Sequence, residues 1–159
     1  MFGLFRKKMT LENAVSTVVN RIVSYDTNSD EMFAQESAFV ACFAIFFCIR
    51  FTRHPSWKRN AKIIYDQFMK GFVKHLNIEF DSTELNLQKI LDRIDLYSTA
   101  INISSSNPTP SNVSNEIGIT FAIVQGKEND EETIHRGARI FMKETNSMFD
   151  LFKKFDLIV

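Results

Sequence analysis

Five cationic side chains lie close together in the middle of this 159-residue sequence, in a stretch with no acidic residue between Glu36 and Asp66. They are Arg50, Arg53, Lys58, Arg59 and Lys62. His54 and Trp57 stand among them. Guanidinium and ammonium groups bind phosphate and carboxylate, and an indole ring stacks on a nucleic-acid base. The cluster therefore indicates a candidate anion-binding site, in which Trp57 would supply the stacking.

Two helix ends are expected to position these charges. Arg50 and Arg53 follow a long apolar stretch, where cations complement the negative end of a helix dipole. Pro55 favours the first turn of the next helix, whose free backbone N–H groups attract anions. We expect the two ends to bring the cations towards one ligand.

An ordinary solvated surface explains the same charges. Lys58 and Lys62 lie four residues apart, and Asp66 and Lys70 continue that spacing, which is typical of an exposed helix face. The arginines would then pair with acidic residues elsewhere in the chain. Candidate partners are Asp92, Asp95, Glu128, Asp130, Glu131 and Glu132. The sequence leaves open whether the basic patch at 50–62 binds a ligand or is paired internally.

Other chemistries find little support in the sequence. Glu132 and His135 have the E-x-x-H spacing of helical di-iron proteins, but such sites need two of these pairs and the chain has one. Cys42 and Cys48 stand six residues apart in an apolar stretch, which predicts buried, reduced thiols. No phosphate-binding glycine loop or nucleophile motif occurs. We expect no metal site and no cofactor, and the sequence favours a non-enzymatic protein.

Hydrophobic spacing predicts helices along most of the chain. Apolar residues recur at three- and four-residue intervals in several stretches. These stretches are 11–25, 57–72, 87–101 and 134–152. Residues 38–49 carry no polar side chain except the two thiols, which predicts a buried central helix at about 30–53. Residues 117–124 fit both a strand and a helix period, and we predict a helix because no partner strand is evident.

Capping residues set the expected starts of three helices. They are Ser29, Asp81 (with Glu84) and Asn129 (with Glu132). The sequence as a whole predicts an all-α bundle of five to six helices around the central helix.

One domain accounts for the chain, since about 150 residues suffice to bury a large core. We expect an N-terminal tail at 1–9 and a single helical domain at 10–159, with a Ser/Pro-rich loop at 104–112. The apolar stretch 38–49 would span about 18 Å against a bilayer core of about 30 Å, so we expect no transmembrane span. Reduced thiols and the lack of a secretory signal favour the cytoplasm.

Two functions fit this picture. Because the net charge is zero, a domain-wide positive field for nucleic acid is absent. We favour a non-enzymatic helical interaction or adaptor protein that binds an unidentified protein or a second copy of itself. The alternative is an anion-binding module for a phosphorylated ligand, nucleic acid or anionic lipid, which would use the basic patch at 50–62. Nucleic acid and an anionic membrane surface are the less favoured partners.

Overall fold

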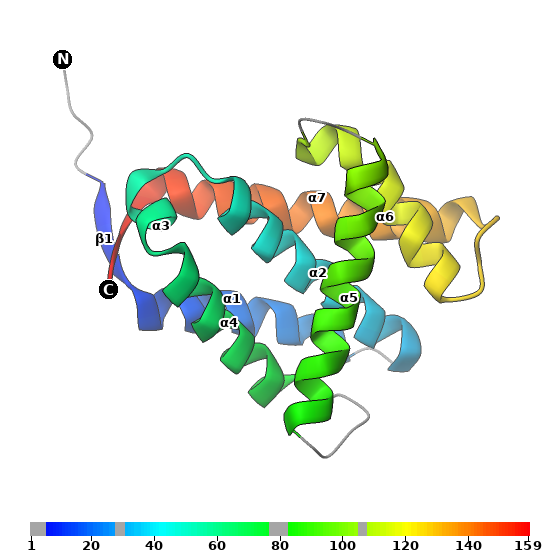
Figure 1. The fold of residues 1–159 in the computed structure, drawn as a ribbon, viewed down its shortest axis with the longest axis horizontal. Coiled ribbons are helices and arrows are strands. Elements are labelled where there is room, and N and C mark those ends of the chain that lie inside the picture. The colour runs from blue at the N-terminus through cyan, green and yellow to red at the C-terminus, as the bar shows by residue number, and fades with distance from the viewer. Residues whose placement is uncertain (1–5, 28–30, 77–82, 105–107) are drawn as a thin grey trace.

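The computed structural model describes residues 6–27, 31–76, 83–104 and 108–159. These residues are mostly helical, with one short sheet of two parallel strands (Figure 1). In chain order the elements are β1 (Lys7–Thr10), α1 (Leu11–Val23), the 3-10 turn η1 (Ser24–Thr27), α2 (Glu31–Phe51), α3 (Pro55–Arg59), α4 (Ala61–His75), α5 (Thr83–Ser104), α6 (Pro110–Val124), α7 (Glu131–Lys154) and β2 (Phe155–Ile158). The predicted all-α fold is confirmed.

Helix α2 is the predicted central helix. Every residue from Ala38 to Ile49 is at most 5% exposed, because this stretch has no polar group that needs water. The Phe43 ring lies 6.0 Å from that of Phe141 on α7 and 5.5 Å from that of Tyr97 on α5. Phe46 meets Phe72 of α4 edge to face. Three other helices therefore pack on the aromatic side chains of α2.

Helix α2 is longer than the apolar stretch 38–49 from which we expected no transmembrane span. Among the described residues, Phe33–Phe51 is long and apolar enough to cross a membrane, so helix length alone does not exclude a span. Core helices of water-soluble proteins pass the same test, and 89% of the tested window is buried inside this fold. In this structure α2 is covered by protein, as a core helix is.

Two buried glutamates are each held by an arginine and a tyrosine that stand four residues apart. On α7, the Glu144 carboxylate accepts hydrogen bonds from Arg21 Nε at 2.5 Å and from the Tyr25 hydroxyl at 2.7 Å. On α2, the Glu36 carboxylate accepts from Arg93 Nε at 3.1 Å and from the Tyr97 hydroxyl at 2.7 Å. We call these groups the Glu144 clamp and the Glu36 clamp. They join α1 to α7 and α5 to α2 through charged contacts.

The expected third helix is broken at Asn60 into α3 and α4. The side-chain amide of Asn60 donates to the Ser56 carbonyl at 2.8 Å, which replaces a backbone partner at that point. Pro55 begins α3 as predicted. The break adds a short helix, which brings the described residues to seven α-helices rather than five or six.

Helices α6 and α7 form a close antiparallel pair. Residues 117–124 lie in α6, so the predicted helix there is confirmed. A Cβ added at Gly118 would lie 2.3 Å from the Ile134 carbonyl oxygen, which shows how near the two backbones approach. Between the helices, Gly126 takes a φ of +66°, a conformation that favours glycine, and ends α6.

Several predicted helix boundaries shift. Asp130 caps α7 by accepting from the Thr133 backbone N–H, so the predicted cap at Asn129 is wrong by one residue. The predicted loop at 104–112 is too long, because α5 includes Ser104 and the Thr109 cap starts α6 at Pro110. The predicted caps Ser29 and Asp81 lie outside the described residues.

The two ends of the described chain meet in the sheet. Strand β1 pairs in parallel with β2, with Lys7 opposite Phe155 and Thr10 opposite Ile158. Both strands lie at the same end of the bundle (Figure 1). The predicted tail at 1–9 is thus partly structured, because Lys7–Met9 belong to β1. Leu157 is 7% exposed and anchors β2 to the core.

Candidate anion-binding cleft at the basic end

The structure does not bring the predicted cations to one point. Arg50, in the last turn of α2, and Lys62, in the first turn of α4, line a cavity between α2, α4 and α5. Arg53 and His54 follow α2 and line a different cleft. Lys58 and Arg59 are exposed on α3 and line neither. The expected convergence of the whole basic patch is therefore not found.

All five predicted cations remain exposed. Within the described part of the chain none of them forms an ion pair, and the expected internal acids do not reach them. Arg50 instead lies over the ring of Phe51, with 5.5 Å from its guanidinium carbon to the ring centroid. Their charge is thus available to a ligand in solution.

A new group of cations lines the second cleft, which has a volume of about 570 Å³. Arg6, Arg53 and Lys153 reach it from three separate parts of the chain. Phe149 and Phe152 supply apolar wall. We call this cleft, together with the cations of β1, α3 and the end of α7 around it, the basic end. Its further cations are Lys7, Lys8, Lys58, Arg59 and Lys154.

The strand pairing positions two of these cations. Helix α7 passes directly into β2 at Phe155, and β1 lies beside β2 in register from Lys7 onward. Arg6, one residue before β1, therefore lies at the end of α7 that carries Lys153. Sequence reasoning missed both residues because a four-residue strand at each end of the chain gives almost no periodic signal.

His54 lies at the centre of a small polar network. Its side chain is 9% exposed, and Nε2 contacts both Arg6 Nη1 and, at 3.4 Å, Asp156 Oδ1. Burial lowers the pKa of His54, the Arg6 charge lowers it further, and Asp156 opposes them. A neutral imidazole is therefore expected at pH 7, with Nε2 accepting from Arg6.

The other ring nitrogen of His54 completes the network. With Nε2 accepting, Nδ1 carries the proton and donates to Ser56 Oγ at 3.2 Å. Ser56 Oγ also accepts from the Leu157 backbone N–H at 3.0 Å. His54 thus links the end of α2 to β2, and its main role in the cleft is to fix Arg6 and the strand.

Trp57 does not have the predicted position. It is fully buried, its indole N–H donates to the Phe155 carbonyl at 3.1 Å, and its ring packs 4.8 Å from that of Phe152. Because neither ring face is open, Trp57 has no surface on which a nucleic-acid base could stack. Its contact with Phe155 instead holds β2 in place.

The cleft keeps a net positive charge. Asp156 pairs with Arg6 at 3.8 Å, and both side chains are more than 40% exposed, so the pair is weak. Among the described residues, Arg53 and Lys153 form no ion pair. With His54 neutral, three cations face one carboxylate.

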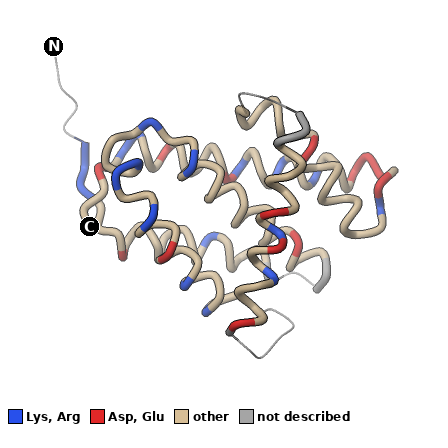
Figure 2. Tube along the Cα trace, viewed as in Figure 1, with Lys and Arg blue, Asp and Glu red and all other residues tan. Residues whose placement is uncertain are grey.

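Cationic residues gather at one end of the molecule, and a cluster of acidic residues lies at the other. Figure 2 shows blue segments gathered around α3, β1 and the neighbouring helix ends, and red segments at the opposite α6–α7 turn. We call that turn the acidic tip. Its acidic residues are Glu128, Asp130, Glu131 and Glu132, and all are exposed. The net charge of zero therefore includes two patches of opposite sign, the basic end and the acidic tip.

Metal ligands do not gather in the described part of the chain: it contains no group of three or more His, Cys, Asp or Glu side chains placed to hold an ion. Glu132 and His135 both lie on the exposed surface of α7. No known protein family, curated protein or solved structure matches this chain.

Proposed function

We propose that this chain is a non-enzymatic helical interaction protein that binds an acidic protein partner through its basic end. The observation that carries the proposal is the cleft in which Arg53 and Lys153 stand beside Arg6 without acidic partners of their own among the described residues. Unpaired arginine next to aromatic wall is typical of protein interfaces, where Arg and aromatic residues are enriched.

An acidic polypeptide suits this surface better than nucleic acid does. The alternative use of the basic patch relied partly on base stacking, and Trp57 is buried. The cleft walls include Phe149 and Phe152, and Phe51, which also lines the cleft, is 42% exposed, so a partner with apolar and acidic side chains would contact both kinds of surface. The proposal requires no cofactor or catalytic group.

The two thiols support a reducing compartment. Cys42 and Cys48 are buried and form no disulfide, and burial raises the pKa of Cys48. Thiols of this kind persist where the environment is reducing, so we place the interaction in the cytoplasm.

A pair of charged polymers tests the proposal. Binding of fluorescently labelled oligoglutamate and oligo-dT of equal charge would be measured against salt concentration for the wild type and for Arg53→Gln/Lys153→Gln. We expect tighter binding of oligoglutamate, and a loss in the double variant that lowers the slope of log affinity against log salt by roughly one for each lost contact.

The matched control is Lys70→Gln/Lys74→Gln on exposed positions of α4, which removes the same charge far from the cleft. It should bind as the wild type does. Preference for oligo-dT would replace the proposal with a nucleic-acid function. No binding of either polymer, or equal losses in both double variants, would overturn the assignment of the cleft.

A further inference from the structure

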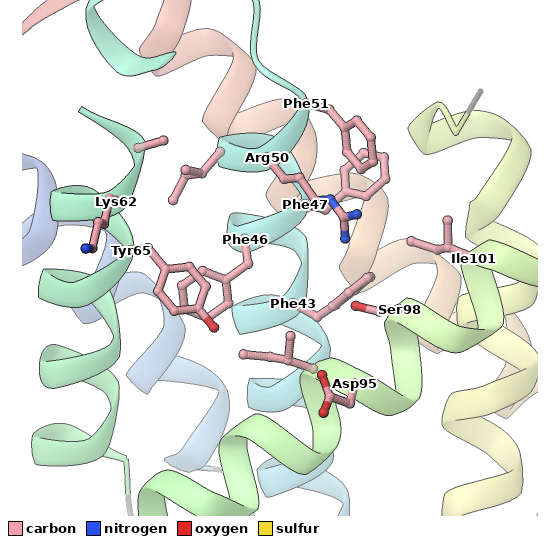
Figure 3. A pocket seen from close by; sticks show the side chains of 13 residues that line it. Phe43, Phe46, Phe47, Arg50, Phe51, Lys62, Tyr65, Asp95, Ser98 and Ile101 are labelled. Atoms are coloured by element: carbon pink, nitrogen blue, oxygen red, sulfur yellow. The ribbon is translucent and has the colours of Figure 1, made fainter. Parts of the chain in front are cut away.

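A cavity of about 410 Å³ lies between α2, α4 and α5, and it shares only Phe51 with the lining of the basic-end cleft. Phe43, Phe46 and Phe47 of α2 form its floor, and Ile94 and Ile101 of α5 form one wall. Figure 3 shows the three rings and Ile101 around this cavity. The walls are therefore suited to an apolar ligand.

Arg50 and Lys62 both line this cavity, and neither forms an ion pair among the described residues. In Figure 3 the Arg50 guanidinium points into the space between α2 and α5, towards the Ser98 side of the opening. Within the described chain Arg50 contacts the Phe51 ring but forms no ion pair, even though Asp95 lines the same cavity. A guanidinium in this state offers paired N–H donors to a carboxylate.

The apolar surface continues beyond the cavity. Tyr65 also lines a second hollow of about 570 Å³ between α4 and α5, together with Met69, Val73 and Leu91. Leu87 in that hollow is 37% exposed. An unbranched chain that entered beside Arg50 would therefore find apolar contact past Tyr65 as well.

We propose that this cavity binds a single-chain amphiphile with a carboxylate head, of the fatty-acid type. The Arg50 guanidinium binds the carboxylate, and the chain lies on Phe43, Phe46 and Phe47 and runs on towards Tyr65. Asp95 repels the head from the other end of the opening, and so fixes the direction of the ligand. This site binds its ligand through Arg50, whereas the proposed protein interaction uses Arg53 and Lys153; the two linings share only Phe51.

Two ligands with the same chain separate the head contact from the chain contact. Calorimetric titrations with dodecanoate and with dodecanol, both below micelle-forming concentrations, would compare the wild type, Arg50→Gln and Asp95→Asn. Arg50→Gln should weaken dodecanoate binding by roughly 10-fold or more, because a hydrogen bond to a charged group is lost. Asp95→Asn should strengthen dodecanoate binding, and dodecanol binding should change in neither variant.

Arg53→Gln is the matched control, since it removes an equally exposed guanidinium from the neighbouring cleft. It should leave dodecanoate binding unchanged. Methyl NMR signals of Ile94 and Ile101 should shift on binding, whereas Leu157 at the basic end should not. No saturable one-to-one binding, or equal losses in Arg50→Gln and Arg53→Gln, or shifts that spare Ile94 and Ile101, would each overturn the proposal.

Discussion

At the scale of single residues, the two glutamate clamps stand out because each contains a buried carboxylate that must be paired. Glu144 is fully buried and Glu36 is 4% exposed, and a buried carboxylate needs partners for its charge and its lone pairs. In each clamp the arginine supplies the charge and the tyrosine a second donor. In each clamp the arginine and tyrosine stand four residues apart, on one helix in the Glu36 clamp and across the junction of α1 and η1 in the Glu144 clamp, so R-x-x-x-Y is the sequence signal that would have found them.

Removing one carboxylate should be costly. Glu144→Ala leaves the partly buried Arg21 and Tyr25 groups without their acceptor, and we expect a loss of about 3–5 kcal/mol in the free energy of unfolding. Urea denaturation followed by circular dichroism measures it. Glu131→Ala, an exposed position on the same helix, should change stability by less than about 0.5 kcal/mol. Similar losses in both variants would contradict the clamp.

The Glu36 clamp should make stability depend on pH. Burial raises the pKa of Glu36 above its ordinary value of 4.5, against the opposing charge of Arg93 and the hydrogen bonds that it accepts. A raised pKa in the folded state means that the protonated group favours folding. Its contribution is therefore complete below pH 4.5 and is lost as the pH rises through the folded-state pKa.

A comparison with Glu36→Gln isolates this contribution, because the variant does not titrate at that position. The free energy of unfolding of the wild type minus that of the variant should fall as pH increases from 4 to 8. The measurement is urea denaturation at several pH values. A difference that stays constant or grows with pH would show that the Glu36 pKa is not raised in the folded protein.

At the scale of helices and strands, strong periodic patterns were predictable and close contacts were not. The apolar run at 38–49 and the stripe at 134–152 place α2 and most of α7 correctly, because burial on one or all sides constrains residue type over many turns. The break at Asn60 depends on one side-chain hydrogen bond. A single polar residue in a helical pattern does not predict such a hydrogen bond.

The close contact of α6 and α7 predicts that a glycine-to-alanine substitution lowers stability, opposite to its usual effect in a helix. Glycine to alanine inside a helix normally stabilises it by about 1 kcal/mol. At Gly118 the new methyl group would meet the Ile134 carbonyl oxygen of the facing helix, at 2.3 Å, and backbone cannot rotate away. We therefore expect Gly118→Ala to lower the melting temperature, measured by calorimetry.

Gly71→Ala provides the graded comparison. There the methyl group would meet a side-chain carbon of Val19 at 2.6 Å, which a change of rotamer or a small shift can relieve. Its melting temperature should fall less than that of Gly118→Ala. If Gly118→Ala instead melts at a higher temperature than the wild type, the close approach of α6 and α7 is wrong.

At the scale of the whole molecule, the small sheet decides where the candidate site lies. Arg53 and His54 are two of the predicted anion-binding residues, and they line the cleft because both follow the central helix. Sequence reasoning could not identify Arg6 and Lys153, because their proximity depends on a pairing between the two ends of the chain. The misplacement of Trp57 has the same origin, since β2 is the element that covers it.

The single tryptophan reports on this sheet. Removal of residues 155–159 would take away the Phe155 carbonyl that Trp57 bonds and uncover the indole ring. We expect the tryptophan emission maximum to shift to longer wavelength while the far-ultraviolet helical signal is retained. Val159→Ser, at a position 59% exposed, is the control and should leave the emission unchanged. An unshifted spectrum after the truncation would show that β2 does not cover Trp57.

The pairing of β1 with β2 also has a consequence for synthesis on the ribosome. Arg6 precedes α1, whereas the strand that fixes it emerges only after α7 has been made. At roughly 5–20 residues per second, the basic cleft stays unassembled until α7 and β2 have also emerged. A partner that recognises the assembled cleft would therefore ignore nascent chains and engage only those in which residues up to Ile158 have emerged and folded.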